Sequence, residues 1–597
     1  MKSVNLFMIS SDSYVSQWWN NHARHGDVSE SAYLPYSLGL LQSYALTDNE
    51  IKNEYYFEDI EIFRKPHDEV LNSLDNPSVV ATSNYIWNTR YHLNLLKKIK
   101  YYWPDCLTIV GGPSVWDKVE WYNDHQYIDV AVLQEGEEIF ASILKSNNYN
   151  EVPGIIFKDN NTFYKTDKSK RISDINVIPS PYLTGIFDRI IENNKNVEFY
   201  ASIESNRGCP FKCTYCDWGG LTHQKMKMFN LERVKAEFDW CGNTKILGVF
   251  LTDSNTGMFK RDVDVIKHFA KVYRQTGYPK YFNTAGYSKT PMNKNWVGKI
   301  QQELNELVYV SKKNKEKHNY TNREINPGSI LHVALQTTNE ETLKNIKRKN
   351  LGIANSDLLD KNNKDTPFAV ELIFPMPGQN YQTMKDDVEL LLKHETASPR
   401  FYPLLVLPKT EFNSEHYIKE HELEFIEVPF NYEPTSQTVL DVDKEFCTII
   451  KSTKTCSEQE IRKSWVFYWV VIRFWYSSIL KYTAKTMENL YDIKRIDFFD
   501  TLTNWMSTTD GWLANNFYKP IYDYVLTSFY SLKPDHRFNN TNLIMLSNNL
   551  DNIYKDVIIF LKDSYDLSRF EIELILDEQI NIIKKTEINR GSWEDTN

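Results

Sequence analysis

The sequence predicts an α/β protein with three parts, and the alternation of strand and helix patterns is the main reason. Short apolar runs that favour strands alternate with helical apolar spacing up to about residue 190, and the alternation resumes near residue 198. Repeated units of this kind imply parallel sheets with right-handed crossovers. After about residue 440 the pattern becomes helical and strongly aromatic. We therefore expect an N-terminal parallel sheet, a central partial or full βα barrel and a mostly α-helical C-terminal part.

The N-terminal strands are predicted where apolar runs end in polar or glycine-containing loops. Their segments are 4–10, 78–88, 105–112 and the start of 129–145, with helices over 33–46 and 89–103. Ligands of open parallel sheets bind at the carboxyl ends of the strands. The loops of interest are therefore Ser10–Ser13, Ser83–Tyr85, Gly111–Pro113 and Gln134–Gly136.

A connecting region follows this sheet. Residues 152–166 predict a hairpin around Asp159–Asn161, and the proline-punctuated stretch 177–183 predicts an extended chain. Six strand–helix units then predict a barrel, in which polar residues at the carboxyl ends of the strands are candidate active-site groups. The strands fall within residues 199–205, 246–259, 279–289, 329–350, 368–393 and 400–410.

Composition and charge narrow the class of protein. The 597 residues are too many for one ordinary core, and 41% hydrophobic with 25% charged residues is typical of soluble globular proteins. A net charge of −10 disfavours binding to nucleic acid, including RNA modification, and to anionic membranes. The basic run at 312–317 is read as a solvated surface.

Two apolar segments and the cysteine content indicate the cellular compartment of the protein. The first residues, MKSVNLFMISSDS, lack the length and cleavage site of a signal peptide and predict a buried strand. The apolar run 464–480 contains Arg473 and is only 17 residues long, so a buried helix is expected rather than a membrane span. Seven cysteines form no disulfide framework, and a reducing cytoplasm fits four of them as scattered free thiols: Cys106, Cys241, Cys447 and Cys456.

The other three cysteines lie within eight residues, in the stretch ESNRGCPFKCTYCDWGG. Cys209, Cys213 and Cys216 have the spacing C-x3-C-x2-C. A structural zinc site would need a fourth ligand, and the nearest histidine, His223, is seven residues past Cys216. Redox chemistry of a C-x-x-C pair needs only two thiols. Three thiolates around one body best match a 4Fe–4S cluster with one iron left open.

This motif, with Tyr215 before the last cysteine and placed after the first barrel strand, resembles the radical S-adenosylmethionine (SAM) superfamily. The resemblance implies that the open iron binds SAM and that an electron from the cluster cleaves SAM to a 5′-deoxyadenosyl radical. Trp218 would wall SAM or a second cofactor. The segment 375–379, PMPGQ, resembles the fifth-strand region that supports the adenosyl group. Further SAM-contact candidates at or after strand ends are Asp253, Asn283, Gln336, Arg348 and Glu371.

The N-terminal half resembles the cobalamin-binding subclass of that superfamily through VGGP (110–113), LQEGEEIF (133–140) and SPYLTGIFD (180–188). This implies a Rossmann-like cobalamin-binding domain (1–150), a linker (151–197), a radical SAM barrel (198–435) and a helical C-terminal domain (436–597) that resembles nothing recognised. The implied corrinoid-contact residues are Ser83, Asn84, Tyr85, Gly111, Gly112, Pro113, Gln134, Glu135 and Gly136.

One departure from that subclass concerns the cobalt ligand. Many cobalamin proteins carry an Asp-x-His-x-x-Gly motif, but Asp12 is followed by Tyr14, and His22 and His25 are too far along to match it. We expect cobalt without a histidine ligand, its lower face met by Ser83–Tyr85, water or nothing.

The resemblance implies a cobalamin-dependent radical SAM methyltransferase that methylates an unactivated carbon through methylcobalamin and the 5′-deoxyadenosyl radical. A rearrangement or cyclisation without methyl transfer, and a non-catalytic iron–sulfur or corrinoid-binding protein, stay open as alternatives. The implied partners are a small-molecule or peptide substrate and an electron donor such as flavodoxin or ferredoxin, with no nucleic acid and no membrane.

Overall fold

The computed structural model describes residues 1–9, 30–218, 225–287, 296–318, 331–350, 368–393, 397–430, 443–527 and 537–585. The predicted loop Ser10–Ser13, with His22, His25 and His223, lies outside the described residues. The chain forms two compact units. The first comprises residues 1–329, 406–414 and 430–446, and the second comprises residues 330–405, 415–429 and 447–597.

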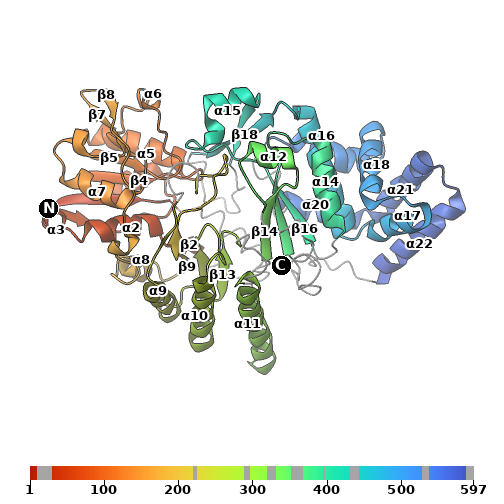
Figure 1. Ribbon diagram of the computed structural model, residues 1–597, viewed down its shortest axis with the longest axis horizontal. Coiled ribbons are helices and arrows are strands. Elements are labelled where there is room, and N and C mark those ends of the chain that lie inside the picture. The colour runs from red at the N-terminus through yellow and green to blue at the C-terminus, as the bar shows by residue number, and fades with distance from the viewer. Residues whose placement is uncertain are drawn as a thin grey trace. The chain divides into compact units, whose positions relative to one another are not determined.

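The first unit begins with a seven-stranded sheet in the order β3-β1-β4-β5-β6-β7-β8 (Figure 1). Its first five strands in that order are parallel and its last two antiparallel. The predicted hairpin is confirmed and extends this sheet as β7 and β8. The strands are β1 (Lys2–Phe7), β3 (Tyr55–Phe57), β4 (Val79–Ser83), β5 (Leu107–Gly111), β6 (Val130–Val132), β7 (Ile155–Asp159) and β8 (Thr162–Lys165).

Helices cover this sheet because its strands are apolar along their length. All five residues of β4 are buried, as expected for a parallel strand covered on both faces. Helix α5 (Thr89–Tyr102) buries Tyr91, Leu95, Leu96 and Ile99, which recur at helical spacing. The helix α7 (Gly136–Lys145) packs on α2 (Tyr36–Ala45), and the shorter helices are α3 (Asn49–Glu54), α4 (His67–Ser73), α6 (Val119–Tyr122) and α8 (Asp188–Asn193).

The first unit also holds a four-stranded parallel sheet in the order β13-β12-β9-β2. The strands β9 (Val197–Ile203), β12 (Gly248–Leu251) and β13 (Tyr281–Thr284) confirm the first three barrel strands. The edge strand β2 (Glu30–Tyr33) was not predicted, because ESAY is short and half polar and pairs with β9 from far along the chain.

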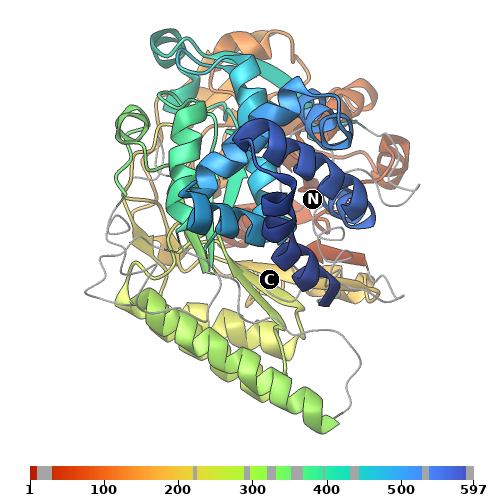
Figure 2. The same cartoon turned by 90° about the vertical axis from the view of Figure 1, so that its right-hand side faces the viewer.

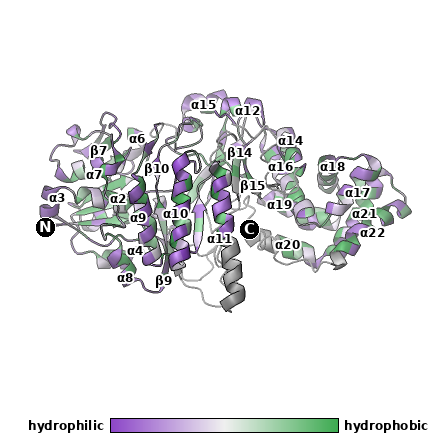
Figure 3. Ribbon diagram, turned by 60° about the horizontal axis from the view of Figure 1, so that its bottom comes forward, coloured by the Kyte–Doolittle hydropathy of each residue, from purple (hydrophilic) through white to green (hydrophobic). Residues whose placement is uncertain are grey.

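Three helices pack on this sheet: α9 (Leu231–Asn243), α10 (Lys260–Thr276) and α11 (Trp296–His318). Helices α10 and α11 lie side by side (Figure 2), and α10 carries hydrophilic residues along its outer face (Figure 3). Its buried positions Val265, Ile266, Phe269 and Val272 lie on the opposite face, as an amphipathic helix requires.

The second unit holds the other three predicted barrel strands as a parallel sheet, β14 (Leu331–Gln336), β15 (Phe368–Ile373) and β16 (Ala397–Tyr402). A register shift between Ala334 and Gln336 bends β14 at its carboxyl end. Further elements are α12 (Glu340–Asn345), α14 (Tyr381–Leu392), α15 (Glu415–Glu420), β17 (Glu424–Pro429) and β18 (Phe446–Ser452).

The remainder of the second unit is helical, as predicted. The apolar run 464–480 forms the second half of α16 (Glu458–Val470) and a following π-helix, η5 (Val471–Tyr476), and its residues 464–475 are all buried. No helix among the described residues is long and apolar enough to span a membrane. The other helices are α17 (Lys481–Tyr491), α18 (Arg495–Thr508), α19 (Lys519–Tyr524), α20 (Arg537–Asn548), α21 (Leu550–Tyr565) and α22 (Arg569–Lys585).

Candidate active site

The three clustered cysteines lie on one loop, residues 208–218, which we call the cluster loop. It follows β9 and the short strand β10 (Asn206–Arg207), at the carboxyl end of the sheet. Cys209 and Cys213 are buried and Cys216 is half-buried. Burial, with a smaller contribution from the neighbouring thiols of Cys213 and Cys209, raises the pKa of Cys216 to about 12. Thiolates gathered on one loop repel one another unless a positively charged metal body lies among them.

The loop after β12 shapes this group of thiols. Gly208 adopts φ = 111°, a left-handed conformation that suits glycine, and its carbonyl accepts a hydrogen bond of 2.6 Å from Ser254 Oγ. The Asn255 Nδ2 atom donates to Cys209 Sγ at 3.4 Å. Amide donors to sulfur are among the contacts that tune iron–sulfur clusters, so the donor set fits one.

A single metal ion fits the thiols less well. Within the described residues, no group of three or more His, Cys, Asp or Glu side chains is arranged to hold one ion. Thiolates around one zinc lie within about 4 Å of each other, given Zn–S bonds of about 2.3 Å. A four-iron body accepts thiolates that are further apart. The C-x3-C-x2-C spacing, without a fourth cysteine or histidine close by in the sequence, is what favours the cluster over the zinc alternative.

Asp253, a predicted SAM contact, anchors the chain that leads to the cysteines. Its carboxylate is fully buried just after β12. It accepts hydrogen bonds from Ser205 N (2.7 Å), Ser205 Oγ, Asn206 N (3.1 Å) and Asn206 Nδ2 (2.8 Å). Burial raises its pKa to about 7, against the opposing effect of these donors. Both oxygens are thus used to hold the turn between β9 and β10.

Arg207, two residues before Cys209, was not singled out from the sequence. Its guanidinium contacts Glu204 (2.9 Å) and Glu137 on α7 (3.0 Å), and lies 3.7 Å from Glu135. Burial alone would lower its pKa, but the carboxylates of Glu137 and Glu204 raise it well above the usual value. The EGEE turn is therefore joined to the start of the cluster loop by ion pairs. In the sequence, Arg207 is visible only as a single cation in the stretch ESNRGC.

The predicted corrinoid contacts gather at the carboxyl edge of the N-terminal sheet. Ser83 ends β4, and its Oγ lies 3.4 Å from Ser37 Oγ. Asn84 N donates to Gly111 O at 2.7 Å. Gly112 has φ = 100°, and a Cβ there would lie 2.6 Å from the Asn84 carbonyl oxygen. The loops ending β4 and β5 therefore touch, with Pro113 next along the chain, and only glycine fits at 112.

A buried histidine supports this edge without facing it. His92 on α5 has one ring nitrogen 2.9 Å from Asn84 Oδ1, and the other accepts from Ile9 N at 3.3 Å. Burial lowers its pKa to about 3, so the ring is neutral and both nitrogens are occupied. Beyond the Ser83–Asn84 pair, Tyr85 stacks on Trp87, with ring centroids 4.5 Å apart.

The residues at the end of β6 make contacts within the protein. Gln134 Oε1 accepts from Ser169 N at 2.5 Å, and Glu135 pairs with Arg171 at 3.0 Å. Gly136 begins α7 where a Cβ would meet Leu41 at 2.9 Å. These three residues thus fix the loop at the sheet edge.

In the second unit, two SAM-contact candidates lie together at the end of β14. Gln336 has φ = 67°, and Arg348 Nη2 donates to Ala334 O at 2.5 Å. Glu371 on β15 lies in register between Ala334 and Arg400. The PMPGQ segment forms a tight turn in which Gln379 Oε1 accepts from Met376 N at 2.7 Å.

The remaining candidates belong to the first unit. Asn283 is exposed on β13, where its Oδ1 accepts from Thr284 N at 2.9 Å. Thr284 Oγ1 in turn hydrogen-bonds Thr256 Oγ1 in the loop after β12. Tyr215 is half-buried, and Trp218 is 42% exposed at the end of the cluster loop.

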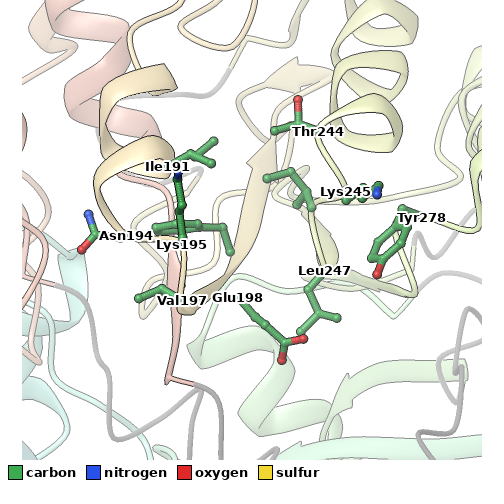
Figure 4. A pocket seen from close by; sticks show the side chains of 11 residues that line it. Ile191, Asn194, Lys195, Val197, Glu198, Thr244, Lys245, Leu247 and Tyr278 are labelled. Carbon is green, nitrogen blue, oxygen red and sulfur yellow. The ribbon is translucent and has the colours of Figure 1, made fainter.

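A shallow cavity of about 280 Å³ lies elsewhere, at the amino ends of β9, β12 and β13 (Figure 4). Its lining includes Val197, Leu247 and Tyr278. Active sites of parallel barrels are built at the carboxyl ends of the strands, so this cavity is not the reaction site.

Comparisons with known proteins indicate the same class of protein as the sequence motifs. The chain matches no family model. It is 28% identical over 409 residues to the cobalamin-dependent radical SAM methyltransferase TokK of Streptomyces tokunonensis, covering 66% of this chain and 57% of that protein. It is 25% identical over 510 residues to 2-(S-pantetheinyl)-carbapenam-3-carboxylate methyltransferase of Streptantibioticus cattleyicolor, covering 83% and 71%. The chain thus spans little more than half of TokK.

A solved structure shows the same fold. It is OxsB, a cobalamin-dependent SAM radical enzyme with aqua-cobalamin and SAM bound, at a TM-score of 0.51 and 11% identity, covering 97% of this chain and 84% of that one. The predicted α/β fold class is therefore confirmed. In sequence the chain is similar to a cobalamin-dependent radical SAM methyltransferase and to a second methyltransferase, in line with the resemblance carried by the cysteine motif and the VGGP and EGEE turns.

Proposed function

We propose that the protein is a cobalamin-dependent radical SAM enzyme that methylates an unactivated carbon of a small molecule. One observation carries the proposal: three neighbouring thiols, held on a loop at the carboxyl end of a parallel sheet, with an amide donor on Cys209 and a second parallel sheet in the same unit. The methyltransferase names of the two relatives support the reaction type.

The proposed cofactors are inferred from the residues that would bind them. Cys209, Cys213 and Cys216 would bind a 4Fe–4S cluster, and the strand-end loops at Ser83–Tyr85 and Gly111–Pro113 would meet a corrinoid. When bound, the cluster supplies the electron that cleaves SAM, and the corrinoid carries the methyl group. Gly112 approaches Asn84 closely and carries no side chain. A flat ligand could therefore lie close to the backbone at this edge of the sheet.

The chain's own residues prepare this site before any ligand arrives. Asp253 and Arg207 fix both ends of the turn that enters the cluster loop. Asn255 and Ser254 fix its first cysteine and the preceding carbonyl. Pre-organised groups need little rearrangement during reaction, and this is a large part of how enzymes accelerate their reactions.

The partners in this proposal are a small-molecule substrate and an electron donor such as flavodoxin or ferredoxin, in a reducing cytoplasm. The relative named for a pantetheinyl carbapenam carboxylate makes that compound the first substrate to try. The net charge of −10 argues against nucleic acid.

The test is anaerobic incubation of reconstituted protein with SAM, hydroxocobalamin, a reductant and candidate substrates. We expect about four irons per chain, 5′-deoxyadenosine, S-adenosylhomocysteine and a product heavier by one CH₂. Cys213→Ala should lose iron, 5′-deoxyadenosine and the methylated product. Cys106→Ala removes another buried thiol, outside the cluster loop, and should keep them.

Two results would contradict the proposal in different ways. Cleavage of SAM with a product of unchanged mass would replace methylation by rearrangement or cyclisation. An iron-loaded protein that binds SAM without cleaving it under any reductant would favour a non-catalytic iron–sulfur protein.

A further inference from the structure

The segment 406–414, which follows β16, contacts both parts of the first unit that would hold cofactors. It belongs to that unit although the strands before it belong to the second. We call it the brace segment. The sequence predicts its first residues, 406–410, only as the end of the sixth barrel strand, and none of its residues is a site candidate.

One end of the brace segment is fixed to the N-terminal sheet by Lys409. Its Nζ donates to Gly112 O at 3.0 Å and to Leu133 O at 3.3 Å. These carbonyls belong to the loops that end β5 and β6, the same loops that carry the Gly111–Pro113 and Gln134–Gly136 candidates. Hydrogen bonds from an ammonium group are roughly twice as strong as neutral ones.

The other end of the brace segment is fixed to the cluster loop. Phe412 N donates to Thr214 O at 2.9 Å, and Thr214 lies between Cys213 and Cys216 in the sequence. Phe412 is fully buried and Thr214 is 2% exposed. A backbone hydrogen bond shielded from water in this way is costly to leave unmade.

The chain between these two anchors is short and internally bonded. Thr410 Oγ1 donates to Leu407 O at 2.9 Å, and Asn413 N donates to Thr410 O at 3.1 Å. Phe412 is three residues after Lys409, and their Cα atoms can lie at most about 11 Å apart even when the chain is extended. The brace segment therefore sets how far the cluster loop lies from the ends of β5 and β6.

The charge of Lys409 also acts on the cluster loop. Burial lowers the pKa of its ammonium group, and the carboxylates of Asp217 and Asp117 offset part of this effect. Asp217 follows Cys216 directly, so the cation attracts the far end of the cluster loop toward the same sheet edge.

We propose that Lys409 is a positioning residue that fixes the cluster loop against the carboxyl edge of the N-terminal sheet and so sets the separation between the iron–sulfur cluster and the corrinoid. The part that concerns the cofactors rests on the proposed function, whereas the brace itself is a property of the cofactor-free chain.

The first test uses the cofactor-free protein and does not depend on the proposed function. Hydrogen–deuterium exchange is compared for Lys409→Met, Lys409→Arg and the wild type. We expect amides of residues 209–216 and 410–414 to exchange about tenfold faster in Lys409→Met, since the charge-assisted bonds are lost. Lys409→Arg should restore most of the protection. Lys393→Met, which removes an exposed lysine paired with Glu389 on its own helix, is the matched control.

The second test uses protein loaded with the cluster and cobalamin. With the cluster reduced and the corrinoid as cob(II)alamin, their two unpaired spins couple through space, and pulsed electron paramagnetic resonance reports the spread of distances. We expect one narrow distance in the wild type and Lys409→Arg and a broadened distribution in Lys409→Met, with iron content unchanged.

The outcomes separate the two claims. Unchanged exchange in Lys409→Met would overturn the brace, and an unchanged distance distribution would overturn its effect on cofactor separation. If Lys409→Met exchanges faster than the wild type but the wild type binds no cobalamin, the proposed function and the cofactor part are overturned while the brace stays supported.

Discussion

Asp253 provides the sharpest test of how this protein positions its cluster loop. Its buried carboxylate has a pKa of about 7, against about 3.9 for an aspartate in an unfolded chain. The folded state therefore holds a proton that the unfolded state has lost between pH 4 and pH 7. The free energy of unfolding must therefore fall as the pH rises through that window, because folding then has to bury the charged carboxylate of Asp253 or protonate it.

The magnitude follows from the size of the shift. Each pKa unit corresponds to about 1.4 kcal/mol, so between pH 5 and pH 8 the wild type should lose about 3 kcal/mol at this site. Asp253→Asn keeps the shape without the titration and should therefore gain about 3 kcal/mol on the wild type over the same range. An amide fits here because Ser205 Oγ can accept instead of donate, and Asn206 Oδ1 is buried without a hydrogen-bond partner and can rotate to accept as well.

Asp253→Ala should behave differently from Asp253→Asn. It leaves two buried backbone N–H groups, of Ser205 and Asn206, without acceptors. At about 1–3 kcal/mol each, the variant should be destabilised by roughly 2–6 kcal/mol near pH 5. It should also retain less iron after reconstitution, because the turn that leads to Cys209 is released.

The assay is urea unfolding of cofactor-free protein, followed by circular dichroism at pH 5, 6, 7 and 8. Asp264→Asn, at an exposed position on α10, controls for the loss of one negative charge. Parallel pH profiles for the wild type and Asp253→Asn would show that this carboxyl group does not titrate in the window, and the reasoning from burial would then be wrong.

Three further predictions concern other contacts of the site. Arg207→Met removes the cation between buried carboxylates, including that of Glu137, and should cost about 3–5 kcal/mol of stability in urea unfolding, with Arg207→Lys intermediate. Gly112→Ala places a Cβ 2.6 Å from the Asn84 carbonyl and should abolish corrinoid absorbance in reconstituted protein while the wild type keeps it. Trp218→Ala, at a side chain 42% exposed, should change stability by less than about 0.5 kcal/mol but alter the yield of 5′-deoxyadenosine; a change in stability alone would assign it to packing.

Local patterns predicted most of the fold. The six barrel strands, the hairpin after residue 152 and the buried aromatic helix at 464–480 were all visible as apolar runs of the right length. The strand β2 was missed because four residues, ESAY, carry no pattern without β9 beside them. The pairing of two distant segments depends on the tertiary structure, and it cannot be predicted from the residues of either segment alone.

The residues of the candidate site also fall into those that the sequence predicts and those that it does not. The three cysteines were predictable, because their spacing is a local property and the loop itself brings the thiols together. Arg207 and Lys409 were not, because Arg207 joins the cluster loop to Glu137, 70 residues away, and Lys409 binds Gly112, 297 residues away. Asp253 was recognised as a strand-end acid, but its four donors come from a turn 47 and 48 residues earlier.

The sequence by itself determined the local features of this protein: the spacing of the three cysteines proposed to hold a cluster, the apolar runs that form its parallel strands and the Gly-Gly pair that follows one of them. Only the tertiary structure decided how those groups are held, since a salt bridge or a hydrogen bond forms wherever the fold brings two groups within about 3 Å. The EGEE turn shows the difference, because Glu135 was read as a corrinoid contact, whereas the fold pairs Glu135 with Arg171 and the neighbouring Glu137 with Arg207.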